Sequence, residues 1–323
     1  LAGAYDAAKA VSYRLVASNG VGTAVSGIVT FSPPVGTGLR TRGETIASDA
    51  AAFYRLGTVA ADDAPANVLA SDDVSALGYL LDVNAVSPLA LAAGQTFRVG
   101  TLGVGAAGGM LSVTGAGALA PLDGTLNLSV EQGALTVETP VAGGGSALVA
   151  KNGAGRATLA GGLSGAARLA VNAGALVFSN AADGTFSAPL TGAGTFEKMG
   201  AGTLTVTERS PGFAGNVVVR EGTLRFGTTG SAYGNADGTL TVEPGAALDV
   251  AASGLGNEKV NLGARTVVVS GAGPDGKGAI VNGGGQSQYN ALKNGSLAGD
   301  VVFGGDSATL NATVGRWDFR DGA

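Results

Sequence analysis

The segment Val219-Arg-Glu-Gly222-Thr-Leu224-Arg-Phe226 contains the pattern that decides the fold of this chain. An apolar residue is followed by two variable residues, a glycine, and then apolar residues at alternate positions. The phrase recurs at 130–137 and 171–178, and in a looser form at 242–250. Its glycines, Gly133, Gly174, Gly222 and Gly245, are 41, 48 and 23 residues apart. If one coil of a stacked repeat takes about 20–25 residues, these steps predict two, two and one coils.

A second phrase lies between copies of the first. The segment Ala150-Lys151-Asn-Gly153-Ala-Gly155-Arg-Ala-Thr-Leu159 matches Glu197-Lys198-Met-Gly200-Ala-Gly202-Thr-Leu204-Thr-Val206 at an offset of 47 residues. Both phrases alternate with the period of two that is typical of strands. Glycines before each strand favour tight corners. We therefore assign a structural role in the repeats to Gly133, Gly153, Gly155, Gly174, Gly200, Gly202, Gly222 and Gly245.

Composition favours one elongated repeat domain over several compact domains. Glycine accounts for 57 of the 323 residues, whereas aromatic residues make up 5% and charged residues 13%. The mean hydropathy of +0.30 indicates apolar surface that must be buried. Most of that surface comes from Ala, Val and Leu, and a compact core usually contains more large rings. A thin core, shared between stacked coils, is expected because a single coil cannot bury its inner face alone.

Two regions of different character divide the chain. Residues 86–323 fit the coil pattern almost throughout, and we expect them to be parallel coils cut from a longer chain. Residues 1–85 contain more Ala and Asp and four of the six tyrosines. We expect this first region to form degenerate coils or a cap, since a terminal repeat must present one face to water. Within it, residues 47–56 suit either a short helix or an irregular strand.

Several functions are disfavoured by residue content. A net charge of −5 and a pI near 4.8 argue against nucleic-acid binding, which needs clustered Lys and Arg. The chain has no His and no Cys, so the usual general base, thiol nucleophile and zinc ligands are missing. Long apolar runs are interrupted by Gly or polar residues, so no membrane-spanning helix is expected. We predict no cofactor and no metal.

The phrases around Lys151 and Lys198 resemble the autotransporter-associated β-strand repeat, whose pattern runs Lys-x-Gly-x-Gly-x-Leu-x-Leu, an insert, and Gly-x-x-x-Val-x-x-Gly-x-Leu. Residues 198–206 with 213–224 match nearly throughout, and residues 151–176 match with a shorter insert. The tail, which runs from residues 279–282 through 297–300 to 315–320, also resembles a segment found in very long surface proteins of this type. The resemblance covers roughly residues 86–323. It implies an all-β fold, a right-handed single-stranded parallel β-helix (β-solenoid), and an extracellular or cell-surface location in the outer-membrane-associated, exported class.

The expected function is that of a non-catalytic structural or adhesive segment, a passenger or stalk of a bacterial surface protein. Its expected partner is a host or environmental surface, with glycan as one candidate. Three alternatives stay open. A polysaccharide-acting enzyme would cluster two or three carboxylates on adjacent coils. A glycan-binding module would expose aromatic residues such as Trp317 and Tyr289 along a groove. A trimeric fibre would differ in its mass in solution.

Acidic residues are the candidates for catalysis or calcium binding. They are the doublets Asp62-Asp63 and Asp72-Asp73 and the group Asp318, Arg320 and Asp321. Adjacent residues of a strand point to opposite faces, so a doublet alone makes a poor catalytic pair. Exposure is the usual state of Asp, and we expect these residues to be solvated loop charges.

The remaining polar and aromatic candidates have structural interpretations that we favour. Lys151 and Lys198 could form a row of ligand-binding groups, but we expect exposed lysines at the edge of a coil. Trp317, the only tryptophan, is expected to pack at a corner rather than to bind sugar. Stacked or corner positions are expected for Asn152, Asn172, Asn180, Asn282, Asn290 and Asn294.

Overall fold

The computed structural model is built from strands throughout the residues that it describes. Backbone and side chains are described for 44–57, 66–143, 145, 147–165, 168–227, 238–250, 262, 265–283, 292 and 294–305. Backbone alone is described for 11–13, 16–19, 22–25, 29–31, 38–39, 230–231 and 260–261. From β5 (Gly38–Leu39) onward, every pairing between strands in these ranges is parallel. The predicted parallel β-solenoid is therefore confirmed.

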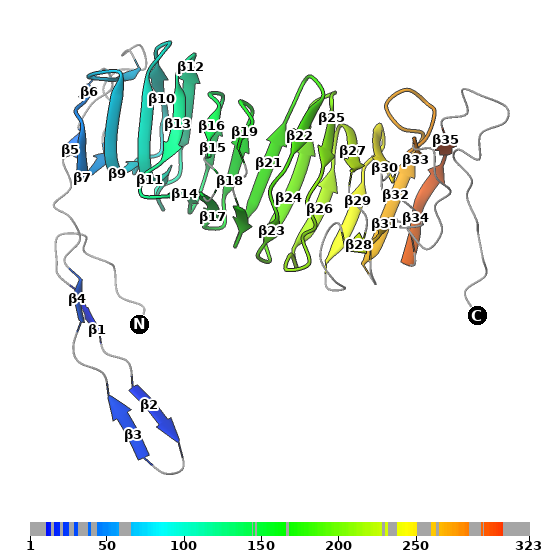
Figure 1. Cartoon of the computed structure of the whole chain (residues 1–323), viewed down its shortest axis with the longest axis horizontal. Coiled ribbons are helices and arrows are strands. Elements are labelled where there is room, and N and C mark those ends of the chain that lie inside the picture. The colour runs from blue at the N-terminus through cyan, green and yellow to red at the C-terminus, as the bar shows by residue number, and fades with distance from the viewer. Residues whose placement is uncertain are drawn as a thin grey trace.

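Sheet 1 runs the length of the stack and has twelve strands. Its strands lie side by side in chain order, each separated from the next by the rest of a coil (Figure 1). They are β6 (Thr45–Ile46), β8 (Asn67–Leu69), β10 (Val86–Leu91), β12 (Met110–Gly115), β15 (Ala134–Val137), β18 (Arg156–Leu159), β21 (Ala175–Ser179), β24 (Thr195–Met199), β26 (Asn216–Val219), β29 (Thr239–Val242), β32 (Thr266–Gly271) and β34 (Asn294–Val301).

Two further sheets complete the coils. Sheet 2 holds β5 (Gly38–Leu39), β7 (Asp49–Leu56), β9 (Asp73–Leu81), β11 (Thr96–Val104), β13 (Ala118–Pro121), β14 (Thr125–Val130), β16 (Val141–Ala142), β17 (Leu148–Asn152), β19 (Leu163–Ser164), β20 (Arg168–Val171) and β23 (Leu190–Thr191). Sheet 3 holds β22 (Gly184–Phe186), β25 (Thr203–Val206), β27 (Gly222–Phe226), β30 (Ala246–Asp249), β33 (Ile280–Asn282) and β35 (Phe303–Gly305). A separate parallel pair joins β28 (Gly230–Ser231) to β31 (Val260–Asn261).

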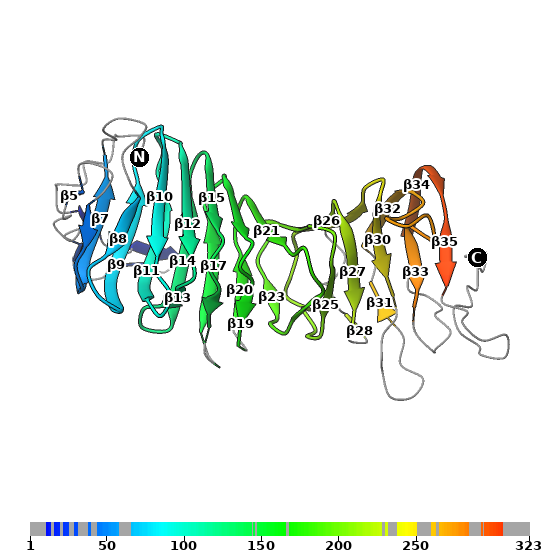
Figure 2. The same ribbon diagram turned by 90° about the horizontal axis from the view of Figure 1, so that it is seen from above.

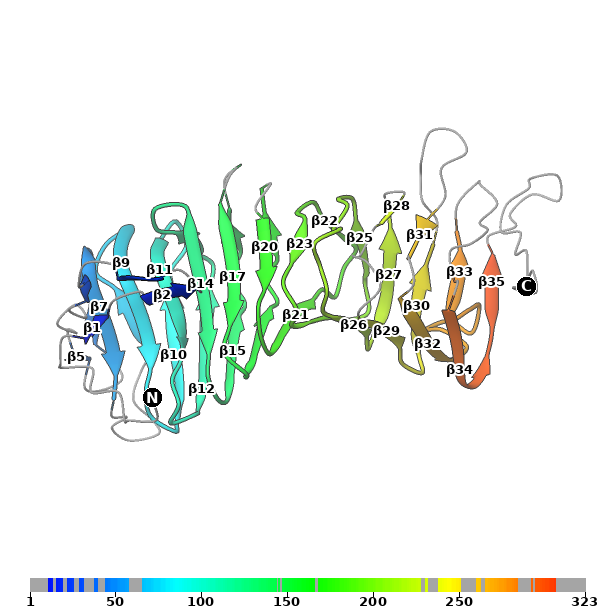
Figure 3. The ribbon, with the colours of Figure 1, turned by 90° about the horizontal axis from the view of Figure 1, so that it is seen from below.

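The shape of the coil changes along the stack. The long strand β11 pairs with β13 through its first half and with β14 through its second half. A tight turn at Asp123 and Gly124, both with positive φ, separates these two shorter strands. The coil therefore has two sides at β9 and β11 and three sides afterwards. Views from above and below show the strands crossing the long axis all along the body (Figures 2 and 3).

One hydrophobic core follows the axis of the solenoid. A single buried cluster extends from Ile46 to Ile280, with contributions from all three sheets. It consists mainly of Val, Leu and Ala, as the composition predicts. The largest aromatic group is formed by Phe178, Phe186 and Phe196, whose ring centroids are 5.1 to 6.1 Å apart. Alternate residues point inward, so each strand buries one face against the neighbouring coils.

The first part of the chain contains two kinds of structure. Strands β6 to β9 already lie in sheets 1 and 2, because β8 pairs with β10 and β9 pairs with β11. Residues 49–56, where a helix was one alternative, form strand β7. Earlier in the chain, β1 (Val11–Tyr13) pairs with β4 (Val29–Phe31), and β2 (Val16–Asn19) pairs with β3 (Gly22–Val25). Both of these pairs are antiparallel, and Figure 1 draws them beside the stack.

The repeat glycines occupy two corners of the coil. Corner 1 precedes each strand of sheet 1 and contains Gly133, Gly155, Gly174, Gly194, Gly215 and Gly238. Corner 2 follows the sheet 1 strand and leads into sheet 3; it contains Gly200, Gly202, Gly222 and Gly245. The step from Gly133 to Gly174 is two coils, and that from Gly222 to Gly245 is one, as predicted. The step of 48 residues from Gly174 to Gly222 is instead two coils plus one side, so its prediction was wrong.

Candidate functional site

Lys151 and Lys198 are the most unusual side chains of the solenoid, because both are buried with 0% exposure. Lys151 Nζ donates to the backbone oxygens of Asn152 at 2.6 Å, Gly153 at 2.7 Å and, one coil further on, Ala173 at 3.2 Å. Three carbonyls therefore use the donors of the ammonium group.

Lys198 repeats this arrangement. Its Nζ donates to the backbone oxygens of Met199 at 2.8 Å, Gly200 at 2.6 Å and, in the next coil, Glu221 at 3.1 Å. Lys151 lies on β17 and binds corner 1, whereas Lys198 lies on β24 and binds corner 2. The same phrase of sequence thus builds the same contacts at two different corners.

Burial is the main cause of an altered acidity in both lysines. It lowers the pKa of Lys151 to about 8 and that of Lys198 to about 8, while nearby carboxylates oppose the shift. The opposing groups are Glu131 for Lys151, and Glu221 with Asp183 for Lys198. Our expectation of exposed lysines at the coil edge is contradicted. The alternation of apolar residues could have predicted this burial, since it places Lys198 on the same inward face of the strand as Phe196.

Arg265 is a third buried cation at a corner, and it was not among the residues singled out from the sequence. Its Nη1 donates to Gly215 O at 2.6 Å and to Thr239 O at 3.3 Å, and its Nη2 donates to Phe213 O at 3.2 Å. The guanidinium also lies over the Phe213 ring, 5.7 Å from the centroid. Arg265 therefore connects its own coil to the two coils before it. No recurring phrase surrounds it, so the sequence offered no signal.

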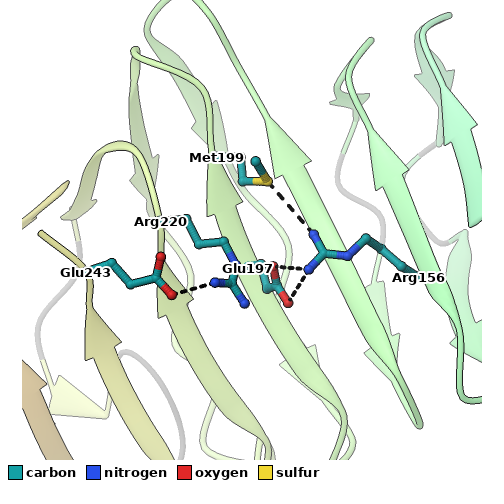
Figure 4. A network of polar contacts seen from close by, with 5 residues as sticks. All are labelled: Arg156, Glu197, Met199, Arg220 and Glu243. Carbon is teal, nitrogen blue, oxygen red and sulfur yellow. Dashed lines mark hydrogen bonds and ion pairs between the residues drawn. The ribbon is translucent and has the colours of Figure 1, made fainter. Parts of the chain in front are cut away.

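A network of charges crosses the outer face of sheet 1 (Figure 4). Glu197 accepts from Arg156 Nη2 at 2.8 Å and from Arg220 Nε at 2.7 Å, although its own side chain is only 4% exposed. Arg220 also pairs with Glu243. Arg156 lies on β18, two strands from β24, and its Nη1 reaches the sulfur of Met199 at 3.9 Å. The network ties together four coils from the outside, and each formal charge has an opposite partner.

Sheet 3 has a smaller buried pair. The carboxylate of Asp249 accepts from Arg225 Nε at 2.7 Å and from the backbone nitrogen of Gly283 at 3.0 Å. Asp249 is buried, whereas Arg225 is partly exposed. The pair joins three successive strands of the sheet, β27, β30 and β33, at one point.

Asparagines stack on the outside of sheet 2, as expected. Asn152 Nδ2 donates to Asn127 Oδ1 at 3.3 Å, and Asn172 Nδ2 donates to Asn152 Oδ1 at 2.8 Å. Asn180 lies at corner 2, where its amide donates to Ala182 O and Thr203 O. Asn282 is buried on β33 and Asn294 is exposed at the start of β34. Asn290 lies outside the described residues.

Glycine is required at the corners for two different reasons. Gly153 has a φ of +76°, a conformation that side chains disfavour. Gly155 has no positive φ, but a Cβ there would lie 2.5 Å from Val130 Cγ1. The same distinction separates Gly133, Gly174, Gly200, Gly222 and Gly245, which have positive φ, from Gly202, which is crowded by Ala182 O.

The carboxylate candidates do not converge within the described part of the chain. Asp73 forms an ion pair with Arg98, with Nε and Oδ1 3.0 Å apart and both side chains exposed. Asp72 contributes a backbone oxygen to the ladder by accepting from Thr96 N. Outside the described residues lie Asp62, Asp63, Tyr289, Trp317, Asp318, Arg320 and Asp321.

Neither a metal centre nor a membrane-spanning helix is found among the residues that the structure describes. No three acidic, His or Cys residues gather there in a way that would hold a metal ion. No helix in that part of the chain has the length and apolarity needed to cross a bilayer. Comparison with family models, with curated proteins and with solved structures gives no match for this chain.

Proposed function

We propose that this chain is a shaft segment of an exported bacterial surface protein, and that it acts through its length and lateral face rather than through catalysis. The observation that carries the proposal is the continuous core from Ile46 to Ile280, shared by coils that stack along one axis. In such a stack, each coil contacts mainly its neighbours, so added coils add reach without changing the fold.

The buried cations support a mechanical role. Lys151, Lys198 and Arg265 each join carbonyls of different coils, and Glu197 joins coils from the outside. These contacts oppose the separation of coils along the axis. Without them, only the core and the backbone hydrogen bonds between strands would hold neighbouring coils together. The resemblance of the Lys151 and Lys198 phrases to a repeat of bacterial surface proteins supports export and the cell-surface location. An environmental or host surface, including its glycans, is the proposed partner.

Surface exposure can be tested on intact cells of the source organism. An antibody raised against the purified chain should label unpermeabilised cells, and external protease should remove the label. A periplasmic or cytosolic protein, labelled in parallel, should stay hidden. Labelling that appears only after permeabilisation would overturn the proposed location.

The non-catalytic part of the proposal needs a separate assay. The purified chain should bind to cells or immobilised glycans without changing them, so a panel of polysaccharides should show no new reducing ends and no unsaturated sugars. Turnover that is lost in a variant of a carboxylate pair would favour the polysaccharide enzyme instead.

A further inference from the structure

One coil of the solenoid separates two different patterns of strand pairing. This junction coil, residues 175–194, contains β21, β22 and β23. It pairs with the preceding coil through sheet 1 and, at β23, through sheet 2. It pairs with the following coil through sheet 1 and, at β22, through sheet 3. Among the described strands, sheet 1 is therefore the only sheet that continues through the junction coil.

The ladders that end at the junction coil are short. Sheet 2 ends with two residue pairs between β20 and β23, and sheet 3 begins with three between β22 and β25. Earlier in the stack, β9 and β11 form eight such pairs. Beyond β23, the same side of the coil is held by an isolated bridge between Gly192 and Phe213 and by a hydrogen bond from Ala214 N to Gly192 O at 2.9 Å. In a stack of repeats, cooperative unfolding depends on the interface between neighbours, so short ladders at one coil favour a division there.

An ion pair crosses the junction coil on the outside of sheet 1. Arg156 lies on β18, before the junction coil, and Glu197 lies on β24, after it, with β21 between them. Arg156 Nη2 nevertheless lies 2.8 Å from Glu197 Oε2 (Figure 4). Val177 of β21 is in register with Glu197, and it is fully buried although the alternation of the strand places it on the outer face. Long side chains that cross β21 account for this burial.

We propose that the junction coil joins two blocks that unfold as separate cooperative units, and that the Arg156–Glu197 ion pair couples them. Block 1 runs from β5 to β20, and block 2 runs from β24 to β35. Block 2 unfolds first, because the strands of sheet 3 have three to five residues, whereas β9 and β11 in block 1 have nine each. When block 2 unfolds, the contact of Glu197 with Arg156 is lost. Arg156 therefore stabilises block 2 although it belongs to block 1, and this inference does not depend on the proposed function.

Unfolding midpoints measured separately for the two blocks test this coupling. The full chain is equilibrated in urea, pulse-labelled by hydrogen exchange and digested, so that peptides from β11 and β14 report on block 1 and peptides from β27 and β32 report on block 2. In the wild-type chain, block 2 should have the lower midpoint. Arg156→Met removes the charge but keeps an apolar stem, and it should lower the block 2 midpoint by about 0.5 M urea or more. The block 1 midpoint should not change, because block 1 unfolds after the ion pair is already lost.

Arg55→Met is the matched control, because Arg55 also lies in block 1 and its side chain is 37% exposed, against 40% for Arg156. Its partner Asp82 lies in block 1 as well, so only the block 1 midpoint should fall. Glu197→Gln repeats the test from block 2, and adding Arg156→Met to it should cause little further shift. A single midpoint for all wild-type peptides, equal shifts of both blocks with Arg156→Met, or a shift confined to block 1 overturns the proposal.

Discussion

Lys151 and Lys198 make equivalent contacts at two different corners of the solenoid. Each ammonium binds the carbonyls of the two residues after it and one carbonyl in the next coil. The offset of 47 residues between them therefore does not correspond to a whole number of coils. The phrase Lys-x-Gly-x-Gly encodes a type of corner rather than a fixed place in the coil.

Replacing Lys198 with Met should destabilise the chain by about 2 kcal/mol, because the carbonyls of Gly200 and Glu221 lose their donor while the apolar stem is retained. Lys151→Met should behave alike. Lys277→Met, at an exposed lysine, is the control and should change the free energy of unfolding by less than about 0.5 kcal/mol. Denaturant titration measures all three. Equal stability of Lys198→Met and Lys277→Met would rule out a structural role for the buried ammonium.

Stability should rise with pH between about 8 and 10 as a result of these lysines. Burial lowers the pKa of both to about 8, whereas lysine in the unfolded chain keeps a value near 10.5. The unfolded state therefore binds more protons in this window, and the free energy of unfolding increases with pH. Tyr79 acts in the opposite direction above pH 10, because burial raises its pKa to about 12.

Comparison of the wild-type chain with Lys151→Met/Lys198→Met isolates the lysine contribution to that pH dependence. The stability difference between them should change by roughly 3 to 4 kcal/mol in favour of the wild type from pH 7.5 to pH 9.5, with about half from each lysine. Parallel stability curves for the two proteins would show that the lysines titrate alike in the folded and unfolded chain.

Glu197→Gln should cost about 2 kcal/mol, since it preserves the shape of the side chain but leaves Arg156 and Arg220 facing a neutral group. The arginines are partly exposed, so solvent reduces the loss below that of a fully buried pair. Asp73→Asn, in the exposed pair with Arg98, should cost less than about 0.5 kcal/mol. Thermal and denaturant unfolding measure both. A larger effect at Asp73 than at Glu197 would contradict the network in Figure 4.

Gly215→Ala should be among the most damaging single substitutions, with a loss of about 3 kcal/mol or more. Its Cβ would lie 1.7 Å from the carbonyl oxygen of Gly194, so the two coils would have to separate. Gly184→Ala is the matched control, because that Cβ would meet no atom within 4 Å and φ is not positive. It should be neutral or slightly stabilising through the unfolded chain. Similar stabilities for the two variants would show that corner 1 is not closely packed.

The sequence allowed the fold to be predicted because the glycine corners and the alternation of apolar residues act locally. Leu204 and Val206 on one face of β25, and Gly153 with positive φ, follow from those rules. The contacts of Arg265 and Glu197 join residues 23 to 52 positions apart, and they depend on which coils become neighbours. The Lys-x-Gly-x-Gly phrase lies at corner 1 in its first copy and at corner 2 in its second, because coil lengths differ along the chain. The spacing between the two copies in the sequence could not reveal this change of corner.

Two in-frame deletions test the stacking of coils most directly. Removing residues 133–173 takes out two whole coils and brings Gly174 to the corner of Gly133, so the chain should stay folded and monomeric with a shorter maximum dimension in X-ray scattering. Removing residues 174–221 places Gly222 at corner 1. The step from Gly222 to Gly238 is then 16 residues, shorter than the step of 19 from Gly155 to Gly174. That variant should lose cooperative unfolding. If both deletions fold equally well, or the first does not fold, the coil assignment is contradicted.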